Sequence, residues 1–364
     1  MASKRRKTSS PGASPAKKAR THVAELPDIA EASPLLSVIQ IPSLSLLLAH
    51  AAGPTAVAAL AAASTTHNTC LQGTLAHLPK LLEPDRTLVL FDEKWGEEGL
   101  FTCKGYPNEH WKENEFPAFA QFPERRLYFN VASAFVAGRL YILGGFSMRS
   151  GGMTADVSSF DVSLNRWSCC TPMPTARGDL VAAAVHAQVY AFGGCGVDGT
   201  QLSSVEAYDV PTNTWQSLPA MPTARAFWGQ GAAVLADLIY VLGGSCMETQ
   251  CSFERYDTER QRWEELPPLP TGRVGCAVAA AAGRVFAVGG SLPPDEPVPI
   301  VEAFDPRLRA WQLQAPMPTA RRSSAAIGSL GRLYIFGGIG YDFDHDSCVA
   351  ECFDIRRGVW EGLQ

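Results

Sequence analysis

The chain has 364 residues, of which 46% are hydrophobic and 18% charged, a composition typical of a globular protein with one large core. Residues 1–20 hold seven basic residues and no acidic one, so the rest of the chain carries 24 basic against 36 acidic residues, a net charge of −12. A body with this charge repels phosphate backbones, which argues against nucleic acid as its ligand.

Residues 1–35 are predicted to form a disordered basic tail, because they are rich in Lys, Arg, Ser, Pro and Ala and show no apolar periodicity. Two basic clusters separated by residues 6–16 follow the pattern of a bipartite nuclear import signal. The residues of this signal are Lys4, Arg5, Lys17, Lys18 and Arg20. We therefore expect an importin as partner and the nucleus as location, with the cytoplasm as a second location. A tail that only improves solubility is the alternative.

Residues 36–83 are expected to form a small α-helical segment. Apolar and small residues recur at i, i+3, i+4 and i+7 on both sides of Gly53-Pro54, with Ser43 and Thr55 placed to cap two short helices. The recurring residues are Leu44, Leu47, Leu48 and Ala51, then Val57, Leu60, Ala61 and Ser64. The run 44–63 has the length of a membrane span, but Gly53-Pro54 breaks it and His50 lies inside it, so we expect no membrane segment.

Three markers repeat through residues 84–364 and predict a repeat architecture. Glycine doublets stand at Gly144-Gly145, Gly193-Gly194, Gly243-Gly244, Gly289-Gly290 and Gly337-Gly338. Tryptophans follow them in steps of 48, 48, 48 and 49 residues, at Trp167, Trp215, Trp263, Trp311 and Trp360. A Pro-x-x-Arg motif precedes each unit and ends at Arg126, Arg177, Arg225, Arg273 and Arg321.

Each unit is expected to contain four strands, with the tryptophan packed between neighbouring units. The run before each glycine doublet, such as residues 189–192, is continuous and rich in β-branched and aromatic residues, as in strands that are buried on both faces. The three markers together resemble the kelch repeat. This resemblance implies an all-β fold, a six-bladed β-propeller over residues 84–364. Its first blade is degenerate, formed by residues 88–92, 99–103 and the strand of Trp111, and has three strands or borrows from residues 71–83.

Residues 42–48 read Pro-x-Leu-x-Leu-Leu-Leu and precede the propeller, a position and an opening that look like those of an F-box. The resemblance implies that residues 42–82 bind the adaptor of a cullin-type, SCF-like ubiquitin ligase. The adaptor-binding residues that it implies are Leu46, Leu47, Leu48, Val57 and Leu60. Ser43 and Leu44 stand where F-boxes commonly have an acidic pair, so a helical cap over the first blade is the alternative.

Strand direction predicts where a protein partner binds. Because adjacent strands of a blade are antiparallel, the segment that enters the first strand and the loop after the second strand emerge on the same face. Aromatic and arginine residues on such a face are typical of binding hot spots. The predicted protein-binding face comprises Arg126, Phe129, Arg177, Asp179, Arg225, Phe227, Trp228, Arg273, Arg321 and Arg322. For the five repeated arginines, pairing with backbone or with neighbouring blades is the alternative.

The function expected from these features is a non-catalytic, protein-binding one: the substrate-recognition subunit of a cullin-type ubiquitin ligase, with a nuclear kelch scaffold as the alternative. An enzyme is not expected, because the propeller histidines, His110, His186 and His345, are scattered and show no metal-ligand spacing. We expect no cofactor and no metal, and a solvated acidic loop at residues 342–346. The ten cysteines contain no CxxC pair and are expected to be reduced.

Overall fold

The computed structural model describes residues 36–40, 44–49, 56–62, 86–94, 97–104, 128–147, 150–161, 164, 166–227, 231–244, 251–329, 331–336, 338, 340 and 350–363. Every regular element in these ranges is a β-strand, so the all-β class is confirmed for the described part of the chain. That part contains no helix that is long and apolar enough to cross a membrane. The predicted basic tail, with its import signal, lies outside the described residues.

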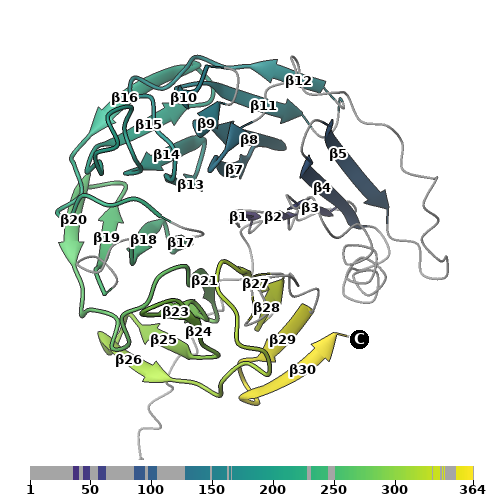
Figure 1. Ribbon diagram of the computed structural model, residues 1–364, viewed down its shortest axis with the longest axis vertical. Coiled ribbons are helices and arrows are strands. Elements are labelled where there is room, and N and C mark those ends of the chain that lie inside the picture. The colour runs from purple at the N-terminus through teal and green to yellow at the C-terminus, as the bar shows by residue number, and fades with distance from the viewer. Residues whose placement is uncertain are drawn as a thin grey trace, which may run out of the picture.

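Five sheets of four antiparallel strands, called blades I to V here, stand around a central axis (Figure 1). Blade I contains β7 (Ala132–Val136), β8 (Arg139–Leu143), β11 (Val157–Asp161) and β12 (Arg166–Cys169). Blade II contains β13 (Val181–Val185), β14 (Gln188–Phe192), β15 (Val205–Asp209) and β16 (Thr214–Leu218). Blade III contains β17 (Ala232–Leu235), β18 (Leu238–Leu242), β19 (Phe253–Asp257) and β20 (Arg262–Glu265).

Blade IV contains β21 (Ala277–Ala281), β22 (Arg284–Val288), β25 (Val301–Asp305) and β26 (Ala310–Leu313). Blade V contains β27 (Ala325–Ser329), β28 (Arg332–Phe336), β29 (Ala350–Asp354) and β30 (Val359–Leu363). In each blade the chain runs from the innermost strand outward, and the innermost strands of neighbouring blades pack against one another. Shorter strands lie beside blades I and IV: β6 (Tyr128–Phe129), β9 (Phe146–Ser147), β10 (Gly152–Met153), β23 (Ser291–Leu292) and β24 (Glu296–Pro297).

The repeated glycine doublets and Pro-x-x-Arg motifs meet between blades. The N–H of Gly145 donates to the carbonyl of Arg177 at 2.8 Å, and the N–H of Gly194 donates to the carbonyl of Arg225 at 2.9 Å. Gly193 has a φ of 57°, and a Cβ atom on it would lie 2.4 Å from the Arg225 carbonyl oxygen. Glycine is required there both for the left-handed backbone and for the close approach of the next linker.

The tryptophans pack between blades, which confirms the role predicted for them. The indole N–H of Trp263 in blade III donates to the Pro219 carbonyl, just after blade II, at 2.9 Å. The indole of Trp311 in blade IV reaches the Pro267 carbonyl, just after blade III, at the same distance. The Trp311 ring also packs against Phe253 of blade III, with ring centroids 5.0 Å apart. Each tryptophan of this kind fixes its outer strand to the preceding blade.

A further sheet, the closing sheet, stands between blades V and I (Figure 1). It contains β1 (Leu36–Gln40), β2 (Leu44–Ala49), β3 (Ala56–Ala62), β4 (Arg86–Lys94) and β5 (Glu97–Lys104) in that order. Its innermost strand, β1, packs against both β7 and β27. The pairing of β3 with β4 is parallel, so this sheet differs from the four-stranded antiparallel blades. Five of the six predicted blades are therefore confirmed. The strands predicted at 88–92 and 99–103 are present in the closing sheet, and the predicted strand of Trp111 lies outside the described residues.

The helices predicted within residues 42–82 are wrong for the described residues, because β2 and β3 occupy that segment. Leu46, Leu47, Leu48, Val57 and Leu60 all belong to these strands. Both segments are almost continuously apolar, and a short continuous run fits a strand in a covered sheet as well as a helix. The pairing with β4, another apolar run, favours the strand, since it satisfies the backbone groups of both segments.

Candidate protein-binding face

The linkers into the first strands and the loops after the second strands lie side by side on one face, as strand direction predicts. In blade I, β9 pairs with β6 from the linker and with β10 from its own loop. In blade II, Cys195 of the loop forms an antiparallel β-bridge with Gly178 of the linker. In blade IV, Ser291 of the loop forms one with Val274 of the linker. We call this surface the loop face. The opposite surface, formed by the tight turns of the hairpins, is called the turn face.

Four repeated arginines lie beneath the loop face, each paired with a glutamate of its own blade. Arg177, Arg225, Arg273 and Arg321 are all 0% exposed. Their partners are the second residues of β15, β19, β25 and β29, namely Glu206, Glu254, Glu302 and Glu351. The N–O distance is 3.0 Å in the Arg177–Glu206 pair and 2.6 Å in the Arg321–Glu351 pair.

Neutral groups complete each of these buried clusters. The hydroxyl of Thr175, two residues before Arg177, donates to Glu206 at 2.6 Å, and equivalent threonines serve the other three glutamates. The Arg177 guanidinium also donates to the carbonyls of Gly193 and Ser204, at 2.9 and 3.0 Å. Burial lowers the pKa of Arg177, and the Glu206 carboxylate opposes that shift. The cluster thus joins the linker, the loop and the third strand of one blade.

This geometry overturns the assignment of Arg177, Arg225, Arg273 and Arg321 to the binding surface, because no part of them reaches solvent. The alternative left open by the sequence, a structural pairing, is the one observed. The partner glutamates were missed, although they recur in steps of 48, 48 and 49 residues, like the tryptophans. A search for a carboxylate with the period of the arginines would have found them.

The other residues predicted for this face lie in different environments. Phe227 is only 5% exposed and belongs to the core shared by blades II and III, so its assignment to the surface is wrong. The side chain of Arg322 is 19% exposed and forms an ion pair of 2.9 Å with Asp295, between β23 and β24. Arg126 and Trp228 lie outside the described residues, and Phe129 is described only as backbone of β6.

Asp179 lies where the linker enters β13 and connects three blades through its backbone. Its N–H donates to the Asn130 carbonyl at 3.0 Å, and its carbonyl accepts from the N–H of Phe227 at 2.9 Å. Asp179 and Asn130 both have a left-handed φ, 51° and 58°, which Asp and Asn tolerate better than most residues. Burial raises the pKa of the half-buried Asp179 carboxyl to about 6, although a hydrogen bond with the Asn130 side chain opposes the shift.

The side chains that the loop face exposes come from the loops. Val197, after β14, is 75% exposed, the highest value among the exposed large hydrophobic residues of the described chain. Its neighbour Asp198 and Glu296 of β24 are also exposed. Hydrogen bonding to Thr200 lowers the pKa of Asp198, so this carboxylate is charged at neutral pH. Among the described residues, these fully exposed groups of the loops are apolar and acidic.

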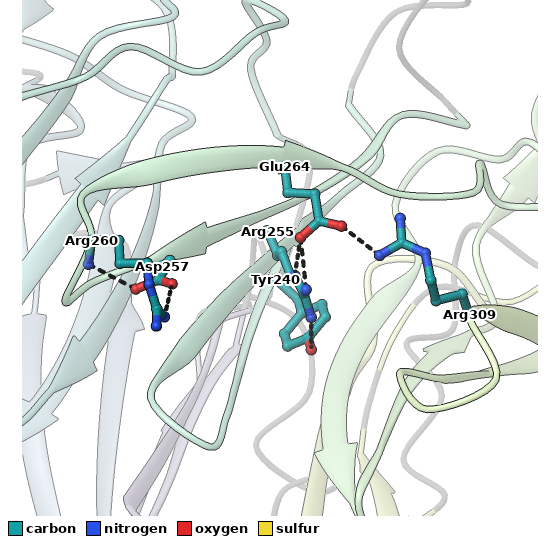
Figure 2. A network of polar contacts seen from close by, with 6 residues as sticks. All are labelled: Tyr240, Arg255, Asp257, Arg260, Glu264 and Arg309. Carbon is teal, nitrogen blue, oxygen red and sulfur yellow. Dashed lines mark hydrogen bonds and ion pairs between the residues drawn. The ribbon is translucent and has the colours of Figure 1, made fainter.

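The outer rim carries arginine–carboxylate networks that join blades (Figure 2). Glu264 of β20 accepts from Arg255 of β19 at 2.8 Å, and also pairs with Arg309, which precedes β26 of the next blade. The hydrogen bond from Arg309 is the largest cause that lowers the pKa of Glu264. Figure 2 also shows Arg260 paired with Asp257 within a single turn, at 3.0 Å. The contacts of Glu264 thus connect blade III to blade IV.

The described residues offer little for chemistry. No three His, Cys, Asp or Glu side chains within them come close enough together to hold a metal ion. The cysteines at positions 169, 170, 195, 251, 276 and 352 are free thiols. The acidic segment 342–346 lies outside the described ranges.

Comparisons with known proteins agree with this architecture. A family profile described as the KLHDC2/KLHL20/DRC7 kelch-repeats domain matches residues 107–290, and a kelch-motif profile matches residues 272–318. An F-box/kelch-repeat protein of Arabidopsis thaliana is 42% identical over 71 residues, which are 19% of this chain and 19% of that protein. The match thus spans about a fifth of the relative. The solved structure of YjhT has a TM-score of 0.61 at 15% identity, covering 72% of this chain and 90% of that one, which supports the fold alone.

Proposed function

The chain belongs to the kelch-repeat family, and from this premise we propose that it is a non-catalytic protein that binds a protein partner on its loop face. The observation that carries the proposal is the construction of that face. Loops from several blades are paired with the linkers and stand on buried arginine clusters, so exposed side chains are presented from a rigid base. The exposed groups are apolar and acidic, which suits a partner segment with apolar and basic side chains.

The proposal can be tested with two matched double variants. Val197→Arg with Glu296→Arg alters the loop face, whereas Leu164→Arg with Leu308→Arg alters the turn face. All four positions are exposed, so both variants should keep the stability of the unaltered chain to within about 0.5 kcal/mol per site. Captured proteins would be compared by affinity purification and mass spectrometry. We expect the first variant to lose partners that the second retains, and the reverse result would move the binding site to the turn face.

A ligase subunit is the second candidate, favoured by the name of the Arabidopsis relative and by the opening at residues 42–48. In this reading the propeller holds a substrate and the N-terminal part contacts the cullin adaptor. The strands β2 and β3 are not F-box helices, so adaptor binding requires either another surface or a change of this segment.

Recovery of the adaptor with the purified chain tests this second candidate. Leu47→Asp with Val57→Asp should abolish the complex if residues 42–82 form the contact. An adaptor that never binds the unaltered chain would overturn the candidate and leave a kelch scaffold as the function. A nuclear scaffold further requires that importin binds the basic tail, residues 1–35. Neutralising Lys17, Lys18 and Arg20 should then shift the chain to the cytoplasm, and an unchanged distribution would argue against the signal.

A further inference from the structure

The two parts of this chain use different basic residues. All eight lysines lie in the first 112 residues, at Lys4, Lys7, Lys17, Lys18, Lys80, Lys94, Lys104 and Lys112. Residues 113–364 contain 19 arginines and no lysine, whereas residues 1–112 contain only four arginines. A preference for arginine throughout the chain would not produce this boundary.

Structure explains the choice of arginine at only some of these positions. In the buried clusters, one guanidinium reaches several acceptors at once, as Arg177 does with Gly193, Ser204 and Glu206. Lysine has a single nitrogen and cannot match that geometry. Arg255 similarly places two nitrogens on Glu264, at 2.8 and 2.6 Å. Arginine is therefore required in the clusters and favoured in the rim network.

Other arginines have no such requirement. Arg262, Arg307 and Arg356 are exposed on the turns and outer strands of blades III, IV and V. Within the described part of the chain their guanidinium groups make no ion pair, and exposed pairs contribute only about 0–1 kcal/mol in any case. A lysine at these positions would keep the charge and the solubility. Packing and electrostatics therefore do not account for the absence of lysine.

Reactivity does distinguish the two side chains. A deprotonated lysine ε-amine attacks the carbonyl of a ubiquitin thioester, forming an isopeptide bond as the C–S bond breaks and the enzyme's cysteine leaves as a thiolate, while one amine proton passes to a base. The guanidinium of arginine stays protonated and delocalised, and it does not act as this nucleophile. A surface with arginine in place of lysine keeps its charge and offers no acceptor.

We propose that the five blades are kept free of acceptor amines, so that transfer of ubiquitin to this chain is confined to residues 1–112. The inference rests on the second candidate function, in which the chain works beside a ubiquitin ligase. A receptor that holds substrates near the ubiquitin-transferring enzyme is itself close enough to be ubiquitinated. Blades without lysine would not accept ubiquitin, so the receptor would not be degraded together with its substrate.

The test places lysines where the fold tolerates them. The variant Arg262→Lys, Arg307→Lys, Arg356→Lys would be compared with Arg262→Gln, Arg307→Gln, Arg356→Gln in cultured eukaryotic cells. Both should melt within about 2 °C of the unaltered protein, since the three sites are exposed. We expect the lysine variant alone to acquire ubiquitin at positions 262, 307 and 356. Its half-life should fall about twofold or more, and a proteasome inhibitor should restore it.

A lysine variant as long-lived as the unaltered chain, with ubiquitin found only at positions up to 112, would overturn the inference. Partner capture by the loop face is measured separately on the same variants. Capture that persists while the half-life stays unchanged rejects this inference and leaves the protein-binding function in place. If the unaltered chain captures no adaptor and the half-life of the lysine variant is also unchanged, both the ligase candidate and the inference are rejected.

Discussion

The buried linker arginine Arg177 is held by acceptors from separate parts of its own blade. Arg177 contacts the carbonyl of Gly193 after β14, the carbonyl of Ser204 before β15, and the carboxylate of Glu206 within β15. In a sequence, a repeated arginine on a linker is equally consistent with a ligand-binding surface and with a buried pair. The deciding information is the carboxylate 29 or 30 residues further along, which balances the buried charge and offsets the free-energy cost of burying it.

Glu206→Gln should destabilise the propeller by about 3–5 kcal/mol, because it leaves the guanidinium of Arg177 buried without a counter-charge. Arg166→Gln is the matched control, since Arg166 is exposed and should stay within about 0.5 kcal/mol of the unaltered protein. Denaturation by guanidinium chloride measures both free energies of unfolding. A loss below about 1 kcal/mol for Glu206→Gln would mean that the buried arginine clusters do not stabilise the blades.

At the scale of elements, the second strands were predicted within one residue of their observed bounds. The apolar runs 140–143, 189–192 and 239–242 became β8, β14 and β18, each of which begins one residue earlier, at Arg139, Gln188 and Leu238. The apolar run marks the part of a strand that is covered on both faces. The strand itself continues to the turn face, where Arg139 pairs with Asp161 across the register.

Residues 44–62 could not be assigned in the same way. Their apolar residues fit the spacing of a helix and also form short continuous runs that fit a buried strand. The periodicity of the sequence therefore does not distinguish helix from strand. The strand follows from pairing with β4, whose residues come more than twenty positions later. The prediction of the loop face had a similar limit. Strand direction placed its linkers and loops correctly, but the exposure of each side chain depends on the residues that it contacts, which sequence spacing alone does not identify.

The inter-blade role of the tryptophans predicts a graded response at Trp311. Trp311→Phe keeps an aromatic ring near Phe253 and Phe304 but removes the indole N–H donated to Pro267, so we expect a loss of about 1 kcal/mol. Trp311→Ala also removes the ring contacts and should cost about 3 kcal/mol or more. Thermal unfolding of both variants gives the comparison. Equal losses would contradict the hydrogen bond as a separate contribution.

At the scale of the whole molecule, the ring is closed by residues from the N-terminal side alone. Blade V takes all four of its strands from residues 325–363, so it lends no strand to the closing sheet. The closing sheet instead combines β1, β2 and β3 with β4 and β5, and places β1 against the inner strands of blades I and V. Closure therefore does not depend on pairing the two ends of the repeat region.

This arrangement predicts that two N-terminal deletions differ sharply. Removing residues 1–35 should leave the melting temperature unchanged, because that composition cannot bury apolar surface. Removing residues 1–62 takes away β1, β2 and β3, which uncovers β4 and the flanks of β7 and β27. The melting temperature should then fall by about 10 °C, with increased binding of an apolar dye. If both deletions melt like the full chain, β1 to β3 do not close the ring, and the five blades are stable as an open arc.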